Sequence, residues 1–174
     1  MDSRGIEADA VRDWFSGGEP VLPGEIFSIE LREGFCVVAQ VLSYEADAMG
    51  SYLCAFTMVP MHEDNRVEEL DQRDVISVKF VTADSFNMPE WQRIGRAPIL
   101  PVEVFLDLKA ARKVGFIGTE IFGGRNVTKF LCACFGLRAW DDWANPTYLD
   151  SMLLPGTPRP PLARMKSDFE RLPS

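Results

Sequence analysis

Histidine is almost absent from this chain of 174 residues, and the four cysteines lack the spacing of a metal site. His62 is the only histidine, and the closest cysteine pair, Cys132 and Cys134, has C-x-C spacing. A zinc site built from Cys and His needs about four such ligands, commonly in C-x-x-C pairs. The sequence therefore predicts no metal site and no cofactor. All four cysteines lie in apolar runs, which predicts buried, reduced thiols.

The signatures of common enzymes are also missing. The chain has no G-x-S-x-G nucleophile elbow, so a hydrolase triad would depend on His62 as its base. Neither glycine motif that cradles phosphates, G-x-x-x-x-G-K-[ST] or G-x-G-x-x-G, occurs. We expect His62 to lie in a solvated loop and the glycines of GFIG and FGGRN to serve turns and bulges. The sequence thus favours a protein that is not an enzyme.

Positive charge is in the minority, with 18 Lys and Arg against 26 Asp and Glu and a net charge of −8. Proteins that bind nucleic acids or anionic membranes normally carry a basic surface that neutralises phosphates. The charge therefore argues against nucleic acid and membrane as partners and permits a basic protein partner. No run approaches the ~20 apolar residues of a membrane span. The N-terminus lacks the apolar core of a signal peptide, so we expect a cytoplasmic protein.

The residues that are present predict a single α+β domain over residues 1–154, followed by a proline-rich C-terminal tail over 155–174. Strand-like runs come first and helical patterns last, which is typical of this class. Three runs between Gly24 and Val59, separated by turns, predict a meander, and residues 74–83 predict a fourth strand. Further strands are predicted at 100–108 and 113–122, with a loop at 84–98. The sheet is expected to be mainly antiparallel, either curved or closed into a small barrel.

One helix is predicted at the N-terminus and two short helices near the C-terminus. The first fifteen residues have an apolar face and are followed by two glycines. The second helix is expected to begin at Asn126 and end at Gly136, and the third to begin at Asn145 and end at Leu154. The tail is expected to run extended over the surface or to be partly disordered.

An acidic run over residues 63–74 is the predicted partner-binding segment. It holds six acids against two arginines, and clustered charge of one sign raises the rate of association with an oppositely charged protein. An exposed loop with no partner remains the alternative. The six predicted contact residues are Glu63, Asp64, Glu68, Glu69, Asp71 and Asp74.

A second cluster combines carboxylates with tryptophans. Asp141 and Asp142 stand between Trp140 and Trp143, which could indicate an acid pair in an aromatic cleft, as in sugar hydrolysis. The alternative is a loop whose tryptophans anchor it to the core, because adjacent carboxylates rarely point at one substrate. Trp91 is a further candidate for a binding surface, since tryptophan is frequent at interface hot spots.

Several short segments carry a resemblance to a known family. The segment LPGEIFSIELREGFCVVAQVL, with Gly24, Glu25, Ile26 and Phe27, resembles the opening of the immunity protein 26 family of bacterial polymorphic-toxin systems. Residues 91–95, WQRIG, and residues 135–154 are similar to the middle and closing pieces of that family. The chain departs from the pattern at Glu25, where aspartate is expected, and at Glu30, where proline is expected. The resemblance covers roughly residues 22–154.

This resemblance implies an immunity protein, or antitoxin, that neutralises a cognate toxin domain by stoichiometric protein–protein contact in the cytoplasm. A nuclease toxin binds a polyanion and tends to be cationic, so an acidic antidote would complement it. Two alternatives stay open at this point. One is a generic protein-binding or regulatory module built on a small barrel, and the other is a hydrolase that uses Asp141, Asp142 and His62.

Overall fold

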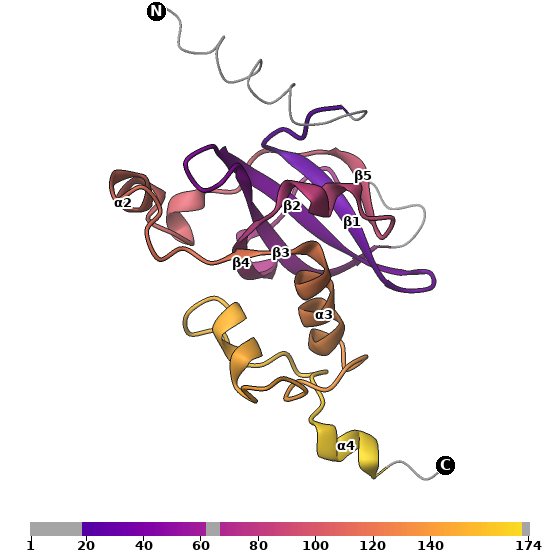
Figure 1. Cartoon of the computed structure of the whole chain (residues 1–174). Helices are drawn as coiled ribbons and strands as arrows, with labels where there is room; N and C mark the ends of the chain where they lie inside the picture. Colours follow the sequence, from indigo (N-terminus) through magenta and orange to yellow (C-terminus); the bar gives the residue numbers. More distant parts are fainter. Residues whose placement is uncertain (1–18, 62–66, 172–174) are drawn as a thin grey trace, which may run out of the picture.

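The chain forms a six-stranded sheet with strand order β5-β1-β2-β3-β4-β6, flanked by short helices (Figure 1). These elements come from a computed structural model that describes residues 19–61 and 67–171. The N-terminal helix predicted for the first fifteen residues lies outside the described residues. His62, Glu63 and Asp64 lie outside them as well.

The meander and the fourth strand are confirmed. Strands β1 (Glu25–Arg32), β2 (Phe35–Glu45), β3 (Ser51–Met61) and β4 (Val75–Val81) pair in sequence order, each antiparallel to the next. The turn between β1 and β2 contains Gly34 at φ +71°, a backbone conformation that glycine adopts without steric cost. Tyr44 and Tyr52 face each other across β2 and β3 with ring centroids 4.9 Å apart. The local alternation of residue types was therefore sufficient to predict this part of the sheet.

The predicted loop at 84–98 is wrong in its second half. After the 3-10 turn η2 (Ala83–Asn87), residues Trp91–Arg96 form strand β5, which pairs antiparallel with β1 and places Phe27 opposite Arg93. β5 is an edge strand whose residues after Trp91 are all exposed. A polar edge strand lacks the apolar alternation by which strands are recognised, so its pairing comes from tertiary structure.

The strand predicted at 100–108 is also wrong. Residues Val102–Val104 form the 3-10 turn η3, and Leu108–Lys113 form helix α2. Asp107 caps α2, because its side chain accepts a hydrogen bond from Ala110 N at 2.9 Å. Pro98 and Pro101 cannot donate to a strand ladder, which explains why this apolar segment stays outside the sheet. Of the strand predicted at 113–122, only β6 (Ile121–Phe122) forms, parallel to β4.

The sheet is open, which corrects the small-barrel alternative. β5 and β6 form its two opposite edges, and no pairing joins them among the described residues. Register shifts interrupt four of the five strand pairs, and such bulges increase the local bend and twist of a sheet. The α+β class and the mainly antiparallel sheet are confirmed.

The sheet buries apolar side chains on both faces. Because side chains alternate along a strand, Phe27, Val37 and Cys54 point to one face, and Ile26 and Val38 point to the other. We call these the helix face and the loop face. On the helix face lie α3 (Gly124–Cys134) and the C-terminal segment, which Figure 1 shows on the same side of the sheet. On the loop face, residues 97–121 form the cover.

The two C-terminal helices are confirmed in part. Helix α3 begins two residues before the predicted Asn126, with Gly123 at its N-cap, and Gly136 follows its C-terminus at φ +68° as expected. The helix predicted at 145–154 is a 3-10 helix, η4 (Tyr148–Met152), which begins later than predicted. Asn145 accepts hydrogen bonds from Thr147 N and Oγ1 at 3.1 and 2.9 Å, so it holds the turn before η4.

The proline-rich segment is fastened to the rest of the molecule. Arg164 forms a parallel bridge with Ala139, and Trp140 N donates to Arg164 O at 2.8 Å. Pro160 is buried, and a short helix, α4 (Lys166–Glu170), follows. Residues 160–165 are therefore held against the helix-face core, where Ala163 and Met165 pack.

Candidate functional site

The described part of the acidic run is anchored by one apolar side chain. Leu70 is buried in the loop-face core, whereas its neighbours Glu68 and Glu69 are exposed. The 3-10 turn η1 (Gln72–Asp74) follows, and the side chain of Asp74 is exposed as well. A segment fixed at Leu70 thus presents three of the predicted carboxylates to solvent. Exposure makes them available to a partner.

Asp71 differs from the other acids because it is engaged within the segment. Its carboxylate accepts a hydrogen bond from Arg73 N at 2.8 Å and two more from Arg73 Nε at 3.0 and 2.9 Å, which caps η1. The hydrogen bonds from the Arg73 side chain and backbone lower the pKa of Asp71 to about 2. Asp71 therefore holds the turn, and Arg73 offsets its charge.

The acidic segment forms one side of a pocket of about 580 Å³. The opposite side is formed by residues 98–101, of which Ile99 is 50% exposed. Glu69 and Ile99 therefore place a carboxylate and an apolar side chain at the same depression. Sequence reasoning identified the acids but missed residues 98–101, which it assigned to the end of a loop and the start of a strand.

A single buried side chain holds residues 97–100 in place. Gln40 on β2 is fully buried, and its Nε2 donates to Ala97 O at 3.3 Å and to Pro98 O at 3.0 Å. Its Oε1 accepts a hydrogen bond from Leu100 N at 3.0 Å. These three bonds satisfy backbone groups that the prolines prevent from joining a strand ladder. The shape of the pocket wall therefore depends on Gln40.

The segments that carry the family resemblance meet in the fold. Residues 91–95 lie in β5, directly beside the Glu25–Phe27 part of β1. Gly24 has φ +91°, and a Cβ atom there would lie 3.1 Å from Ala97 O. The buried Glu25 carboxylate accepts a hydrogen bond from Leu22 N at 2.8 Å and pairs with Arg93 at 3.3 Å. These residues hold β1, β5 and residue 97 together, so their roles are structural.

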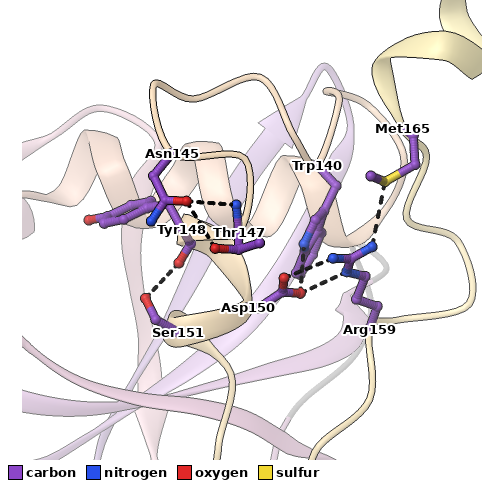
Figure 2. Close-up of polar contacts among 8 residues, drawn as sticks. All are labelled: Trp140, Asn145, Thr147, Tyr148, Asp150, Ser151, Arg159 and Met165. Carbon is purple, nitrogen blue, oxygen red and sulfur yellow. Dashed lines mark hydrogen bonds and ion pairs between the residues drawn. The ribbon is translucent and has the colours of Figure 1, made fainter.

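Trp140 and its surroundings also serve the fold (Figure 2). Trp140 is fully buried, and its Nε1 donates to Asp150 Oδ1 at 3.1 Å. Asp150 forms two further bonds with Arg159, at 2.7 and 2.8 Å, which join η4 to the proline-rich segment. The hydrogen bond from Arg159 is the main cause that lowers the pKa of Asp150, and Trp140 contributes.

The acid pair predicted beside Trp140 does not converge on a cleft. Asp141 Oδ1 accepts a hydrogen bond from Lys166 N at 2.7 Å, at the first residue of α4. Asp142 is exposed and pairs with Arg138 at 3.3 Å and with Lys166 at 3.6 Å. Both carboxylates are thus used in contacts around α4. Trp91 is buried as well, and its Nε1 donates to Thr128 Oγ1 at 3.3 Å.

The cysteines are free thiols, as predicted, but only two of them are buried. Cys54 and Cys134 are buried, whereas Cys36 and Cys132 are half-buried. Burial raises the pKa of the Cys54, Cys132 and Cys134 thiols. Within residues 19–61 and 67–171, no group of three or more His, Cys, Asp or Glu side chains is arranged to hold a metal ion. In the same part of the chain, every helix is too short or too polar to cross a bilayer.

Searches of protein-family models, of curated proteins and of solved structures found no significant match to this chain. The assignment to the immunity protein 26 family therefore stays a hypothesis, which rests on the motifs themselves. Because the described motif residues pack β1, β5 and Trp140, they are informative about the fold and say little about a partner.

Proposed function

We propose that this chain is an immunity protein that neutralises a cationic toxin domain by stoichiometric contact. The observation that carries the proposal is the 580 Å³ pocket at which Glu69 and the half-exposed Ile99 meet, with the exposed Glu68 and Asp74 in the same acidic segment. We name the exposed residues Glu68, Glu69, Asp74 and Ile99 the acidic rim.

The chemistry of the acidic rim fits a basic protein better than a small substrate. Interfaces commonly combine an apolar contact at their centre with charged residues around it, and the charges steer the encounter. Here Ile99 would supply the apolar contact, and the carboxylates would attract Lys and Arg side chains of the partner. A toxin that acts on nucleic acid carries such side chains, because it must bind phosphates. The toxin's active surface would then be covered without any bond being made or broken.

The carboxylate-hydrolase alternative is not proposed, since Asp141 and Asp142 are used in contacts with α4 and Arg138. A binding module with a different basic partner is distinguished by experiment. The chain is co-expressed with a candidate toxin domain encoded by a neighbouring gene, and survival of the host is scored. Rescue of growth and recovery of a one-to-one complex are expected; a toxin that still kills, with nothing recovered in a pull-down, would refute the immunity function.

A pair of charge-reversal variants tests the surface. Glu68→Lys combined with Glu69→Lys removes the exposed carboxylates without disturbing Asp71, which caps η1. The matched control, Glu33→Lys with Glu170→Lys, changes the net charge equally at exposed residues of a turn and of α4. The rim variant is expected to associate with the toxin at least about tenfold more slowly at low salt. Equal association rates for the two variants would remove the acidic rim from the interface.

Stability is the companion measurement for both variants. Exposed charges contribute about 0–1 kcal/mol each, so the free energy of unfolding should change little in either variant. A slower association rate with unchanged stability assigns the effect to the interface. An unfolded rim variant would instead show that the segment is part of the core.

A further inference from the structure

A second pocket, of about 390 Å³, lies on the helix face and has the opposite charge. It is lined by the end of β1, by the exposed side of α3 and by the residues that follow α3. Three of its lining residues are cations, one from each of these segments: Arg32, Lys129 and Arg138. Such a concentration of positive charge is unexpected in a chain with a net charge of −8.

The positive charge of this pocket is incompletely neutralised. Arg138 pairs with Asp142 at 3.3 Å, and Lys166 shares the same carboxylate at 3.6 Å. Arg32 and Lys129 have no carboxylate within 4.0 Å among the described residues. They lie against aromatic rings instead, with Arg32 5.8 Å from the centroid of Phe35 and Lys129 5.9 Å from that of Trp143. Of the three cations that line the pocket, only Arg138 thus has a carboxylate partner among the described residues.

Two hydrogen-bond donors, one on the lining residue Arg138 and one on Trp143 beside it, lack acceptors among the described residues. The Nε atom of Arg138 is buried and has no partner among the described residues, and the same is true of Nε1 of Trp143. The Arg138 guanidinium lies 5.8 Å from the Trp143 ring centroid, so the two donors belong to neighbouring side chains. A buried N–H without an acceptor is unfavourable, and a hydrogen bond to an anionic ligand would remove that cost.

Apolar side chains form the rest of the pocket wall, apart from Thr128. Leu31 and Leu137 line it, together with the half-buried Cys132, whose Sγ lies 3.6 Å from Leu31 O. A bare inorganic ion would leave these walls in contact with water. The volume falls within the range of small-molecule sites, about 300–1,000 Å³. Guanidinium groups bind phosphate through two parallel hydrogen bonds, and several cations around one site suit a doubly charged group better than a single carboxylate.

We propose that the pocket formed by Leu31, Arg32, Lys129, Cys132, Leu137 and Arg138 binds a small organic phosphate monoester. The phosphate lies among the three cations, and the organic part contacts Leu31 and Leu137. This site is on the sheet face opposite the acidic rim, so it is separate from the proposed toxin contact. The proposal does not depend on that function.

The test uses phenyl phosphate, inorganic phosphate and phenol as probes of the full chain at constant ionic strength. Binding is followed by the indole N–H signal of Trp143 in ¹H–¹⁵N NMR spectra. Phenyl phosphate is expected to give a saturable shift at lower concentration than inorganic phosphate, and phenol none. Equal affinity for phenyl phosphate and inorganic phosphate would refute the claim that the ligand has an organic part. The absence of any saturable shift would refute the binding site itself.

Variants establish where the probe binds. Arg32→Gln with Lys129→Gln replaces two exposed side chains, and Lys109→Gln with Lys113→Gln makes the same charge change on α2. Loss of two charge-assisted hydrogen bonds is expected to weaken phenyl phosphate binding at least about tenfold in the first variant only. Equal weakening in both variants would reduce the effect to overall charge and would refute the site.

Cysteine alkylation provides a second readout within one molecule. Cys132 lines the pocket, whereas Cys36 is half-buried at the start of β2 and does not line it. Phenyl phosphate is expected to slow the alkylation of Cys132 by iodoacetamide and to leave the rate at Cys36 unchanged, as measured by peptide mass spectrometry. Equal protection of both thiols, or protection of neither, would contradict binding in this pocket.

Discussion

The two faces of the sheet are covered in different ways. On the helix face, Phe130, Leu131 and Trp140 are fully buried, and a backbone hydrogen bond ties residue 140 to residue 164. On the loop face, much of the covering segment is only partly buried, including Phe105, Leu106 and Leu108, and the polar Gln40 fastens it. Deep apolar packing thus stabilises one face, and hydrogen bonding to irregular backbone shapes the other. The acidic rim belongs to the more thinly covered face.

The largest expected effect tests this contrast in packing. Phe130→Ala should lower the free energy of unfolding by about 3–5 kcal/mol, because the side chain is fully buried against Trp140, with ring centroids 6.1 Å apart. Leu106→Ala on the loop face should cost less than about 2 kcal/mol, since that side chain is only partly buried. Urea unfolding followed by circular dichroism measures both. Equal losses would mean that the two covers stabilise the sheet equally.

A smaller effect is expected where the C-terminal segment meets α3. A Cβ atom at Gly136 would lie 2.4 Å from Leu162 O, whereas one at Gly34 would meet nothing within 4 Å. Both glycines have φ near +70°, so Gly34→Ala is a matched control for backbone strain alone, about 1–2 kcal/mol. Gly136→Ala should cost about 1–3 kcal/mol more than its control, because a backbone atom must move. If the two variants unfold at the same urea concentration, the segment is not held closely there.

Removing the hydrogen bonds of Gln40 should loosen the segment that covers the loop face. Gln40→Leu keeps the size of the side chain and leaves Leu100 N without its acceptor, which should cost about 1–3 kcal/mol. The amide of Leu100 should then exchange with solvent faster, while amides of α3 should lose protection only in proportion to overall stability. Hydrogen exchange followed by NMR makes this comparison. Unchanged exchange at Leu100 would show that Gln40 does not fix the pocket wall.

The smallest expected effect is a pH dependence of stability that comes from the Asp150–Arg159 pair on the helix face. The pKa of Asp150 is lowered in the folded protein, chiefly by Arg159, so its contribution to stability is complete above the unfolded value, near 3.9, and is lost progressively as the pH falls from there through the lower pKa of the folded state. Because the pair is partly exposed, the contribution should not exceed about 1 kcal/mol. Asp150→Asn should therefore lower the Tm more at pH 7 than at pH 3. The same loss at both pH values would assign the effect to packing.

The sequence predicted the parts of the fold that depend on near neighbours. Strands β1 to β4 follow from residue alternation and intervening turns, and the end of α3 follows from Gly136. Strand β5 was missed because its polar residues pair with β1 only in the folded chain. The strand predicted at 100–108 was wrong because apolar content there serves packing onto the loop face, between prolines that cannot join a ladder.

The candidate sites likewise combine local features, which the sequence predicted, with long-range contacts, which it did not. The acidic character of residues 68–74 is a local property and could be predicted, although the engagement of Asp71 by Arg73 could not. The opposite wall of that pocket is held by Gln40, which lies 57 to 60 residues from its hydrogen-bond partners. Arg32, Lys129 and Arg138 likewise come from separate segments, so no pattern in the sequence predicted the basic pocket.

The bond from Trp140 N to Arg164 O also bears on the order in which the protein can acquire its structure during synthesis. Strands β1 to β4 are complete once residue 81 has been made, and their pairings are between sequence neighbours. The amide of Trp140 has this acceptor only after the ribosome has added Arg164. The helix face can therefore close fully only after Arg164 has been added, although it becomes the more deeply packed of the two.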